Sequence, residues 1–477
     1  MSEELGITVK KDKDFSEWYT QVLQKASLIE YTDVSGCYIL RPYVYEIWET
    51  IQEHFNKKIK DKGVKNAYFP LLIPESLLKK ESDHVKGFTP EVAWVTESGS
   101  TKLNERLAIR PTSETIMYAA YSKWIRSHKD LPLKINQWVN VVRWEFKTPV
   151  PLLRSREFLW QEGHTAFATK EEADAEVLDI LEAYREIFED LYAIPVFKGK
   201  KSEKEKFAGA LYTTSIETFL GNGKAIQCGT SHCLGQNFAK VFDINFLDEK
   251  GEKQYVWQNS WGISTRSIGI MILMHGDDKG LILPPKIAPI HVAIVPIIFE
   301  DSKKQVLKKC NEIKTKLKEF KIHIDDREGY KPGFKFNEWE LKGVPIRLEL
   351  GPKDLEKEQV VLVRRDTGKK EFILIKDLSK KIPLILEDIQ KNLLQNAKKN
   401  IENNTVEVKN YSEFKKAIEN KKLVKALWCE KEICEEEIKD QTSAKSLNIP
   451  FDQNKQKGKC FHCNAEANSY AYFAKSY

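Results

Sequence analysis

The sequence predicts a mixed α/β (α+β) protein that is divided into several domains. Three observations lead to this fold class. The chain has 477 residues, and at roughly 100–200 residues per domain two to four domains are expected. Prolines interrupt the apolar run at 281–290, and a polar segment at 398–404 forms a second break. Between these breaks, apolar strands alternate with helical patterns, as in a small domain with a mixed sheet. We therefore expect domains over 1–284, 288–400 and 405–477.

Composition excludes several classes of protein. Hydrophobic residues make up 41% of the chain and aromatic residues 11%, which argues against a largely disordered protein. The longest apolar stretch, near residue 295, is shorter than the roughly 20 residues that a membrane span needs, and the first residues lack the profile of a secretion signal. We therefore expect a soluble, cytoplasmic protein with no membrane partner. The net charge of +6 is compatible with a polyanionic partner but does not indicate one by itself.

Hydrophobic periodicity locates the elements of the two larger domains. Apolar residues at spacings of three and four predict amphipathic helices, and short runs of β-branched and aromatic residues predict strands. In the first domain, the expected elements are a helix within 1–31, a helix over 41–63, strands at 67–74, 135–146 and 156–168, and a helix over 171–192. In the second domain they are strands at 291–299, 321–326, 344–351 and 359–366, with helices at 302–320, 336–341 and 378–400.

One predicted hairpin carries a pattern that suits phosphate binding. VVRWEF (141–146) ends the first strand, and REFLWQEGHTAF (156–167) opens the second, so that Arg143, Glu145 and Arg154 are expected to point toward one pocket. Guanidinium groups suit phosphate because their fork-shaped donors match its oxygens and stay charged. Residues two apart on a strand face the same side, so Arg143 and Glu145 should converge. For an isolated triplet, the alternative is an ion pair on the surface.

Three further segments combine polar groups with small or apolar neighbours. Arg266 stands in WGISTRSIGIMIL before a run typical of a buried helix, where it needs an anion or else forms a structural salt bridge. RPTSET (110–115) offers hydroxyls, among them those of Thr112 and Ser113, and a carboxylate, which suit either a binding site or a helix N-cap. QCGTSHCLGQ (227–236) predicts a turn of small residues that presents polar groups, or else an ordinary polar turn.

Half of the eight cysteines crowd the C-terminal region, where they form two pairs. They are Cys429, Cys434, Cys460 and Cys463. Without a secretion signal, a reducing compartment is expected, which favours metal binding over disulfides. Four thiolates suit tetrahedral zinc, so the sequence predicts a structural zinc site. The alternative is a set of reduced, buried cysteines without metal.

Taken together, these segments resemble the class II aminoacyl-tRNA synthetases, and specifically the prolyl-tRNA synthetases. Motif 1 of the family is similar to GCYILRPYVYEIWETI with AYFPLLIP, motif 2 to VVRWEF through REFLWQEGHTAF, and motif 3 to WGISTRSIGIMIL. GFTPEVAWV, RPTSET, FAGALYTTSIETF and GTSHCLGQNF resemble the proline-specific members, and the cysteine-bearing tail resembles the archaeal and eukaryotic type. The resemblance covers essentially the whole chain. It implies an antiparallel catalytic sheet flanked by helices, an α/β anticodon-binding domain and a small zinc-binding α+β domain.

The resemblance also implies an activity, that of a proline–tRNA ligase. Proline and ATP give prolyl-adenylate and pyrophosphate, and the prolyl group then passes to the 3′-terminal adenosine of tRNA(Pro). The proline carboxylate and the α-phosphate are both anions, so positioning and charge neutralisation supply most of the catalysis. Mg²⁺ is expected to bridge the phosphates, and the family implies a homodimer formed through motif 1. The short segment between motifs 2 and 3 leaves no room for the editing domain that bacterial-type members insert there.

Site residues follow from the match to the family's motifs. The catalytic residues implied are Arg143, which bridges the α-phosphate and the proline carboxylate, and Arg266, which contacts the γ-phosphate. Proline contacts are expected from Thr112, Glu114, Arg143, Trp160, Glu162, His164, Phe207, His232 and Ser264, together with Phe88. ATP contacts are expected from Arg143, Glu145, Phe146, Arg154, Gln227, Thr230 and Arg266. Without the match, Trp160 and Phe207 would be assigned to core packing.

Two regions are candidates for contact with tRNA. Glu340 and Arg347 are candidates for reading guanine edges, because a carboxylate accepts from base amines and Arg pairs with guanine O6 and N7. Phe336 or Trp339 would stack on anticodon bases, although Trp339 is equally well explained as a core residue. The lysine-rich segment 198–209 either approaches the acceptor stem or forms a solvated loop.

The chain ends in AYFAKSY, with four aromatic residues among its last eight positions. Termini are usually frayed and polar, so this composition predicts a docked end. The resemblance implies that the Tyr477 carboxylate reaches toward the active site. Alternatively, Tyr470, Tyr472 and Phe473 pack on the zinc-binding domain and Tyr477 is loose.

Two other functions are compatible with much of this sequence. The first is a catalytically silent, synthetase-like protein with an RNA-binding or regulatory role. Such a protein is expected to have lost a phosphate-binding arginine, whereas Arg143, Arg154 and Arg266 are all present. The second is adenylate formation for an acceptor other than tRNA, against which the predicted anticodon-binding domain speaks.

Overall fold

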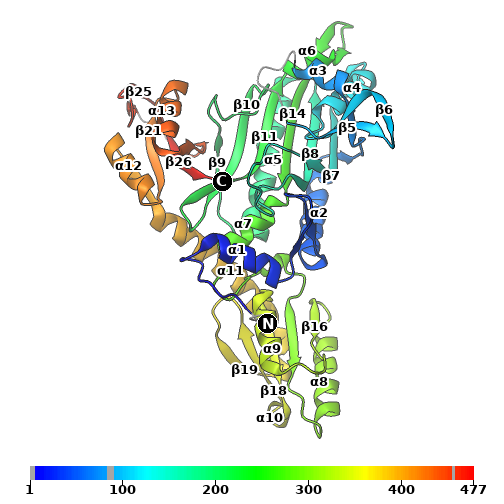
Figure 1. The fold of residues 1–477 in the computed structure, drawn as a ribbon, viewed down its shortest axis with the longest axis vertical. Coiled ribbons are helices and arrows are strands. Elements are labelled where there is room, and N and C mark those ends of the chain that lie inside the picture. Colours follow the sequence, from blue (N-terminus) through cyan, green and yellow to red (C-terminus); the bar gives the residue numbers. More distant parts are fainter. Residues whose placement is uncertain (1–5, 83–90, 454–456) are drawn as a thin grey trace.

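The computed structural model describes residues 6–82, 91–453 and 457–477. The molecule is elongated: a large, mainly antiparallel sheet lies at one end, a smaller α/β domain at the other, and the C-terminal elements at the side of the large sheet (Figure 1). The long helix α11 (Leu378–Asn404) runs from the smaller α/β domain to the C-terminal elements. This arrangement agrees with the predicted fold class, which combines a large sheet flanked by helices, a smaller α/β domain and a C-terminal domain.

The elements of the large N-terminal part alternate between sheet and covering helices. The helices are α1 (Phe15–Lys25), α2 (Pro42–Asp61), α3 (Glu75–Ser82), α4 (Glu114–Trp124), α5 (Lys170–Glu186), continued by a π-helical turn (Ile187–Leu191), α6 (Asn237–Phe242) and α7 (Arg266–His275), with short 3₁₀ turns at His128–Asp130 and Pro285–Ile287. The strands are β1 (Ile29–Tyr31), β2 (Tyr38–Leu40), β3 (Lys65–Asn66), β4 (Leu72–Pro74), β5 (Trp94–Ser98), β6 (Thr101–Ile109), β7 (Leu133–Val142), β8 (Glu157–Phe167), β9 (Phe197–Lys200), β10 (Tyr212–Phe219), β11 (Lys224–Gly235), β12 (Asn245–Leu247), β13 (Lys253–Tyr255) and β14 (Trp257–Ser264).

The remaining elements form the smaller α/β domain and the C-terminal part. The former contains β15 (Val292–Pro296), α8 (Lys303–Lys316), β16 (Ile322–Ile324), α9 (Pro332–Leu341), β17 (Ile346–Leu350), α10 (Pro352–Glu356), β18 (Gln359–Arg364), β19 (Lys370–Leu374), a 3₁₀ turn (Ile375–Asp377) and α11. The latter contains β20 (Thr405–Val408), α12 (Tyr411–Glu419), β21 (Leu423–Trp428), α13 (Glu432–Thr442), β22 (Ala444–Ser446), β23 (Ile449–Pro450), β24 (Gly458–Lys459), β25 (Glu466–Ala467) and β26 (Ser469–Ser476).

The large sheet runs in the order β20-β21-β26-β11-β14-β8-β7-β3, with β10 on β11 and β9 on β10. Strands β7, β8, β14, β11, β10 and β9 pair antiparallel, as the resemblance implied. The face that carries Gln161, Gly163 and Trp261 is covered by helices: the Tyr184 hydroxyl of α5 donates to Gln161 Oε1 at 2.8 Å, and Phe55 of α2 packs against Trp261. Gly163 lies opposite Trp261, and a Cβ there would come within 2.2 Å of its ring. Because side chains alternate along a strand, the next residues face the opposite side, where the site lies.

The smaller α/β domain has a five-stranded mixed sheet in the order β16-β15-β17-β18-β19. Strand β15 is parallel to β16 and β17, while β17, β18 and β19 pair antiparallel. Val292 and Ile294 of β15 pack with Val306, Cys310 and Ile313 of α8 in one buried core. The alternation of strands and helices in the sequence therefore predicted this domain correctly.

The C-terminal part shares its sheet with the large N-terminal part, which the sequence did not indicate. Strand β26 pairs with β21, and its last residues run parallel to the start of β11, with Lys475 opposite Lys224 and Ser476 opposite Ala225. Its own core contains Phe414, Trp428, Phe461 and Phe473, among other residues. The chain end is thus hydrogen-bonded to the strand that carries several of the predicted site residues.

The segment 227–236 is not a turn, contrary to the sequence prediction. Residues 227–235 belong to β11, in the middle of the large sheet, and Gln236 precedes α6. Small residues allow this: Gly229 lies against the ring of Tyr184, whose Cδ2 would be 3.1 Å from a Cβ at that position. Glycines and serines in this segment therefore reflect close packing of a central strand and not loop formation.

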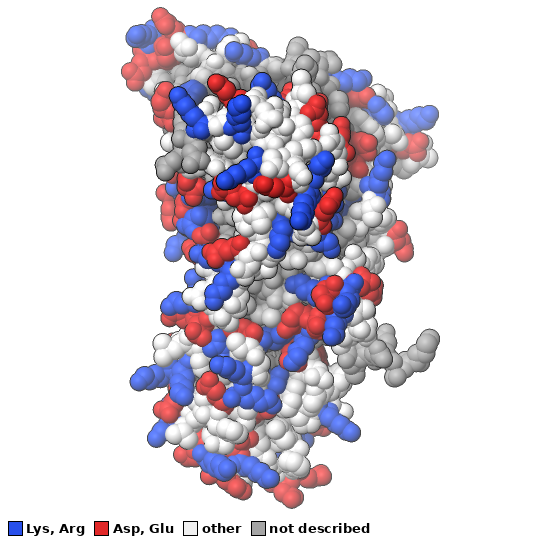
Figure 2. Space-filling model, turned by 90° about the vertical axis from the view of Figure 1, so that its left-hand side faces the viewer, with Lys and Arg blue, Asp and Glu red and all other residues white. Residues whose placement is uncertain are grey.

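Charge and hydropathy give little further indication of function. Lysine and arginine side chains alternate with aspartate and glutamate over the face shown in Figure 2, without a large area of one sign. Among the described residues, the helices are all too short or too polar to cross a lipid bilayer.

Candidate active site

Three neighbouring strands arrange polar side chains in rows across the open face of the large sheet. Glu162 of β8, Gly262 of β14 and Thr230 of β11 form one row. His164, Ser260 and His232 form the next. Gly262 and Ser260 lie in the middle, and their small size leaves space between the larger side chains on either side.

This space is a cavity of about 270 Å³. Twelve of the residues predicted from the sequence line it: Thr112, Glu114, Arg143, Trp160, Glu162, His164, Phe207, Gln227, Thr230, His232, Ser264 and Arg266. Sequence reasoning missed several others, among them Phe158, Glu205, Thr213, Cys228 and Ser260. The alternation along β8 would have revealed Phe158, which precedes Trp160, Glu162 and His164 on the same face. Phe88, a further predicted contact, lies outside the described residues.

Arginines form the cationic end of the cavity. Arg143 directly follows β7, and its Nε donates to the Pro111 carbonyl at 3.0 Å, while its guanidinium carbon lies 5.2 Å from the centre of the Trp160 ring. Arg266 is the first residue of α7, and its Nε donates to the Leu153 carbonyl at 3.0 Å. Burial, followed by the charges of Arg143 and Arg154, lowers the pKa of Arg266 to about 10. Like charges gathered in this way favour the binding of an anion.

Carboxylates form the opposite end. The Thr112 hydroxyl donates to Glu114, and the Ser113 hydroxyl and the Gln137 amide donate to Glu162 at 2.5 and 2.7 Å. His164 Nε2 lies 3.1 Å from Glu162 Oε2. Burial alone would lower the pKa of His164, but the hydrogen bond to Glu162 and the charge of Glu114 outweigh it and raise this pKa. Both carboxylates are buried, so this end suits a cationic group that brings its own donors.

One wall of the cavity consists of Phe207 and His232. Their ring centres lie 4.9 Å apart, and the Thr213 hydroxyl is 2.9 Å from His232 Nδ1. Burial, helped by the charges of His164 and Lys201, lowers the pKa of His232 to about 3. His232 is therefore neutral at physiological pH and presents an apolar ring face to the cavity.

A second, smaller hollow adjoins the arginine end. Phe146, Arg154, Phe158, Ser264 and Arg266 are among its lining residues. The guanidinium carbon of Arg154 lies 5.3 Å from the centre of the Phe146 ring. An aromatic ring under a cationic group is a suitable surface for stacking of a planar base.

The prediction that Arg143 and Glu145 converge on one strand face is wrong. Strand β7 ends at Val142, and Glu145 lies in the following turn, where it is exposed. It lines neither the cavity nor the adjoining hollow in the described part of the chain. The alternation of side chains applies only within a strand, and β7 ends before both Arg143 and Glu145.

The four C-terminal cysteines meet in space, although two come from the start of α13 and the segment before it and two from the segment after β24. Cys429 Sγ and Cys463 Sγ are 3.6 Å apart, and Cys434 Sγ and Cys460 Sγ are 3.8 Å apart. All four sulfur atoms lie within 4.8 Å of one another. Two thiolates that bind one tetrahedral zinc ion at about 2.3 Å are about 3.8 Å apart, so this arrangement fits such an ion.

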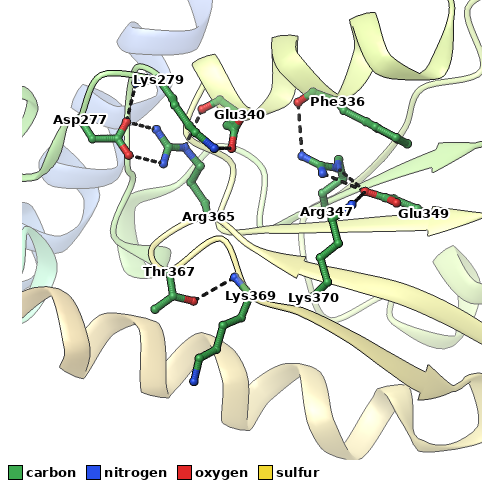
Figure 3. A network of polar contacts seen from close by, with 10 residues as sticks. All are labelled: Asp277, Lys279, Phe336, Glu340, Arg347, Glu349, Arg365, Thr367, Lys369 and Lys370. Atoms are coloured by element: carbon green, nitrogen blue, oxygen red, sulfur yellow. Dashed lines mark hydrogen bonds and ion pairs between the residues drawn. The ribbon is translucent and has the colours of Figure 1, made fainter. Parts of the chain in front are cut away.

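The anticodon candidates are held by partners within the chain (Figure 3). Glu340 Oε1 accepts from Lys279 Nζ at 2.9 Å, close to Asp277, which accepts two hydrogen bonds from Arg365. Arg347 Nη2 donates to Glu349 at 2.8 Å and its guanidinium lies over the Phe336 ring. The Trp339 side chain is buried, which supports its interpretation as a core residue.

The lysine-rich segment 198–209 pairs with carboxylates of the same chain. Lys201 forms a buried ion pair with Glu217 at 2.6 Å, and Lys204 pairs with Glu436 of α13 at the same distance. Its other lysines pair with Glu182 or Glu203. The segment is thus held by ion pairs within the chain, of which that between Lys201 and Glu217 is buried and those with Glu203 are exposed.

Tyr477 is docked, as its composition predicted. Its backbone N–H donates to the Ala225 carbonyl at 3.3 Å, and its hydroxyl accepts from Asn222 Nδ2 at 2.6 Å. Lys224 Nζ lies 4.7 Å from the centre of its ring. Ala225 precedes Gln227 by two residues on β11, so the chain end touches the strand that lines the cavity.

Deletion of Tyr477 is expected to reduce the activity of this site about tenfold, because β11 loses a partner beside Gln227. Zinc content and the melting temperature should change little. A Tyr477→Phe variant is the matched control, since it keeps the ring and the terminal carboxylate and removes only the hydrogen bond to Asn222. Unaltered kinetics after the deletion would show that the chain end serves packing alone.

Comparisons with known proteins agree with this geometry. Residues 94–275 match the model of the tRNA synthetase class II core domain (G, H, P, S and T), residues 291–383 that of the anticodon binding domain, and residues 411–477 that of the prolyl-tRNA synthetase C-terminal domain. The fold and the cavity with its motif arginines thus define a class II aminoacyl-tRNA synthetase.

Comparison with individual proteins indicates which family within this class the chain belongs to. The cytoplasmic proline–tRNA ligase of Arabidopsis thaliana is 54% identical over 99% of this chain and 91% of its own length. The proline–tRNA ligase of Natranaerobius thermophilus is 51% identical over 98% and 97%, respectively. The crystal structure of prolyl-tRNA synthetase from Cryptosporidium parvum, complexed with halofuginone and AMPPNP, superposes with a TM-score of 0.95 at 52% identity, covering 99% of this chain and all of that one. The chain belongs to the prolyl-tRNA synthetase family.

Proposed function

We propose that this protein activates L-proline with ATP and transfers it to tRNA(Pro). The observation that carries the proposal is one cavity with guanidinium groups at one end and buried carboxylates at the other. An amino acid has a cationic and an anionic group, and ATP adds more anionic ones. The cavity matches this distribution of charge.

Proline binds with its ring between apolar surfaces and its charged groups at the two ends. The pyrrolidine nitrogen carries two N–H donors, and Glu114, Glu162 and the Thr112 hydroxyl supply the acceptors. Trp160, Phe207 and His232 enclose the ring, and the proline carboxylate faces Arg143. Buried carboxylates left without a donor are costly, so this end selects for the cationic amine.

ATP occupies the arginine end and the adjoining hollow. Its adenine stacks on Phe146 beside Arg154, and its phosphates lie near Arg266, with Gln227 and Thr230 as further contacts. Mg²⁺ enters with ATP as part of the substrate and bridges its phosphates. Glu145, which was expected to contact ATP, lines neither the cavity nor the adjoining hollow among the residues that the structure describes.

Two displacements complete the reaction. A proline carboxylate oxygen attacks the α-phosphorus, the bond to the pyrophosphate oxygen breaks, and prolyl-adenylate remains. The terminal ribose hydroxyl of tRNA then attacks the prolyl carbonyl, and AMP leaves. Arg143 lies between the two reacting anions and neutralises both, while the protein forms no covalent intermediate.

The remaining features of the proposal concern the whole protein. Cys429, Cys434, Cys460 and Cys463 hold one structural Zn²⁺, with no position left for a substrate. The domain over 288–400 binds the anticodon, and Glu340 and Arg347 read its bases after exchanging their present partners. The enzyme is a homodimer formed through motif 1 and acts in the cytoplasm.

ATP–pyrophosphate exchange tested across the amino acids decides between the functions. Exchange that depends on proline, followed by charging of tRNA(Pro), is the expected result. Exchange with another amino acid, or none, would overturn the proposal. The catalytically silent alternative is not favoured, because Arg143, Arg154 and Arg266 all converge on the site.

Alanyl-tRNA(Pro) is expected to form at a measurable rate and to persist. A pocket shaped for a pyrrolidine ring cannot exclude a smaller amino acid by steric means, and each missing methylene weakens binding by only about 1–3 kcal/mol. The product should persist because residues 168–265, which the structure describes in full, form α5, α6 and strands of the catalytic part, with no inserted editing domain.

The check is to charge tRNA(Pro) with alanine and follow deacylation by the purified protein. Prolyl-tRNA(Pro) incubated in parallel supplies the control for spontaneous hydrolysis. Selective, rapid loss of the alanyl product would contradict the prediction.

A further inference from the structure

The loop between β9 and β10 forms part of the cavity wall. Residues 201–211 make up this loop, and Glu205 and Phe207 line the cavity. The Phe207 N–H donates to the Thr213 hydroxyl at 2.9 Å, and the Phe207 ring packs on His232. The position of this loop therefore sets the width of the space for the proline ring.

A side chain of the C-terminal domain fixes the start of this loop. Glu435 of α13 accepts hydrogen bonds from the hydroxyls of Ser202, at 3.0 Å, and Ser446. The Ser202 hydroxyl in turn accepts from the Glu205 backbone N–H at 3.1 Å. Only 3% of Glu435 and 5% of Ser202 are exposed. A buried chain of hydrogen bonds thus connects Glu435 of α13, through Ser202, to the backbone of Glu205, which lines the cavity.

Further contacts between the two domains surround this chain of hydrogen bonds. Lys204 Nζ is 2.6 Å from Glu436 Oε1, and Lys445 Nζ is 3.4 Å from Glu205 Oε2. Strand β23 pairs with β9, and a Cβ on Gly199 would come within 2.4 Å of the Ile449 carbonyl oxygen. The loop is therefore held from the side of the C-terminal domain and not only by its own sheet.

We propose that Glu435 is a positioning residue for proline binding: through Ser202 it holds the loop that places Phe207 against His232. The inference rests on the proposed function, because it assigns the amino acid end of the cavity to proline. Glu435 follows Cys434 directly on α13, so the helix that carries one of the four cysteines also carries the contact to the cavity wall. The C-terminal domain thereby shapes the proline site without touching proline.

Kinetics of ATP–pyrophosphate exchange test the role of Glu435. Glu435→Ala is expected to raise the KM for proline about tenfold and leave the KM for ATP and kcat nearly unchanged, since it loosens contacts to proline that are equally strong in the ground state and the transition state. Glu435→Gln should restore the wild-type KM, because an amide oxygen still accepts from both serines. Ser202→Ala should resemble Glu435→Ala, and the double variant should be no worse than either single one.

Asp440→Ala is the matched control, because Asp440 is an exposed carboxylate further along α13. It should keep the wild-type KM for proline, and all variants should keep the wild-type metal content and melting temperature. An unchanged KM for proline in Glu435→Ala would overturn the inference. So would a parallel rise of both KM values with a lower melting temperature, which indicates a purely structural role. Absence of proline-dependent exchange in the wild type would instead refute the proposed function.

Discussion

Replacing Arg143 with lysine is expected to lower proline-dependent ATP–pyrophosphate exchange by about a thousandfold and to leave the fold intact. The guanidinium of Arg143 is anchored by the Pro111 carbonyl and lies against Trp160, so its remaining donors face the cavity. Lysine keeps the charge but not the planar fork that holds two anions at once. The loss should therefore appear in kcat and not only in the KM for either substrate.

Steady-state exchange assays and thermal unfolding of the same samples measure this effect. Arg126→Lys is a suitable control, because Arg126 is an exposed arginine two residues after α4 and is not among the residues that line the cavity. Exchange close to the wild-type rate in the Arg143→Lys variant would show that the role is assigned to the wrong residue.

Removing two cysteines is expected to eliminate metal binding and to unfold the C-terminal domain locally. The wild-type protein should contain about one zinc ion per chain, and a Cys460→Ser, Cys463→Ser variant should contain none, because two thiolates cannot replace four. The four sulfur atoms hold together segments far apart in the chain, with Cys429 in contact with Cys463 and Cys434 with Cys460. Without the metal, these segments lose their common anchor.

Metal analysis and limited proteolysis of residues 405–477 are the measurements. Cys37→Ser is the control, since Cys37 is far from the cluster in sequence and has no part in it. Unchanged zinc content in the double variant would refute the ligand assignment. Wild-type protein treated with a strong chelator should show the same proteolytic pattern as the variant.

The sequence alone located the longer helices and many of the residues that line the cavity. The spacing of apolar residues located α2 and α5, because the stripe that faces a core recurs with the helical period whatever it packs against. Long consecutive motif matches then identified twelve residues of the cavity, including the two buried carboxylates. Local patterns and matched motifs are properties of neighbouring residues, and the sequence displays them directly.

The tertiary structure decided where strands end and which strands pair. Glu145 follows the end of β7 and is exposed, and the small residues at 227–236 form a central strand instead of a turn. The second outcome depends on neighbours distant in sequence: Tyr184 of α5 packs on Gly229, and β14 pairs with β11 along its polar residues. The hydrophobic period and the composition of a short segment do not specify which distant segments pack against it.

The interface between the C-terminal domain and the catalytic sheet shows most clearly that local sequence does not specify contacts between distant segments. The sequence determined the cysteine pairs and the docked aromatic end, because residue type and spacing carry those features. Only the folded chain brings β26 beside β11 and Glu435 beside Ser202, two residues 233 positions apart. Such contacts arise from the packing of whole domains, in which each surface is complementary to a partner that its own sequence does not specify.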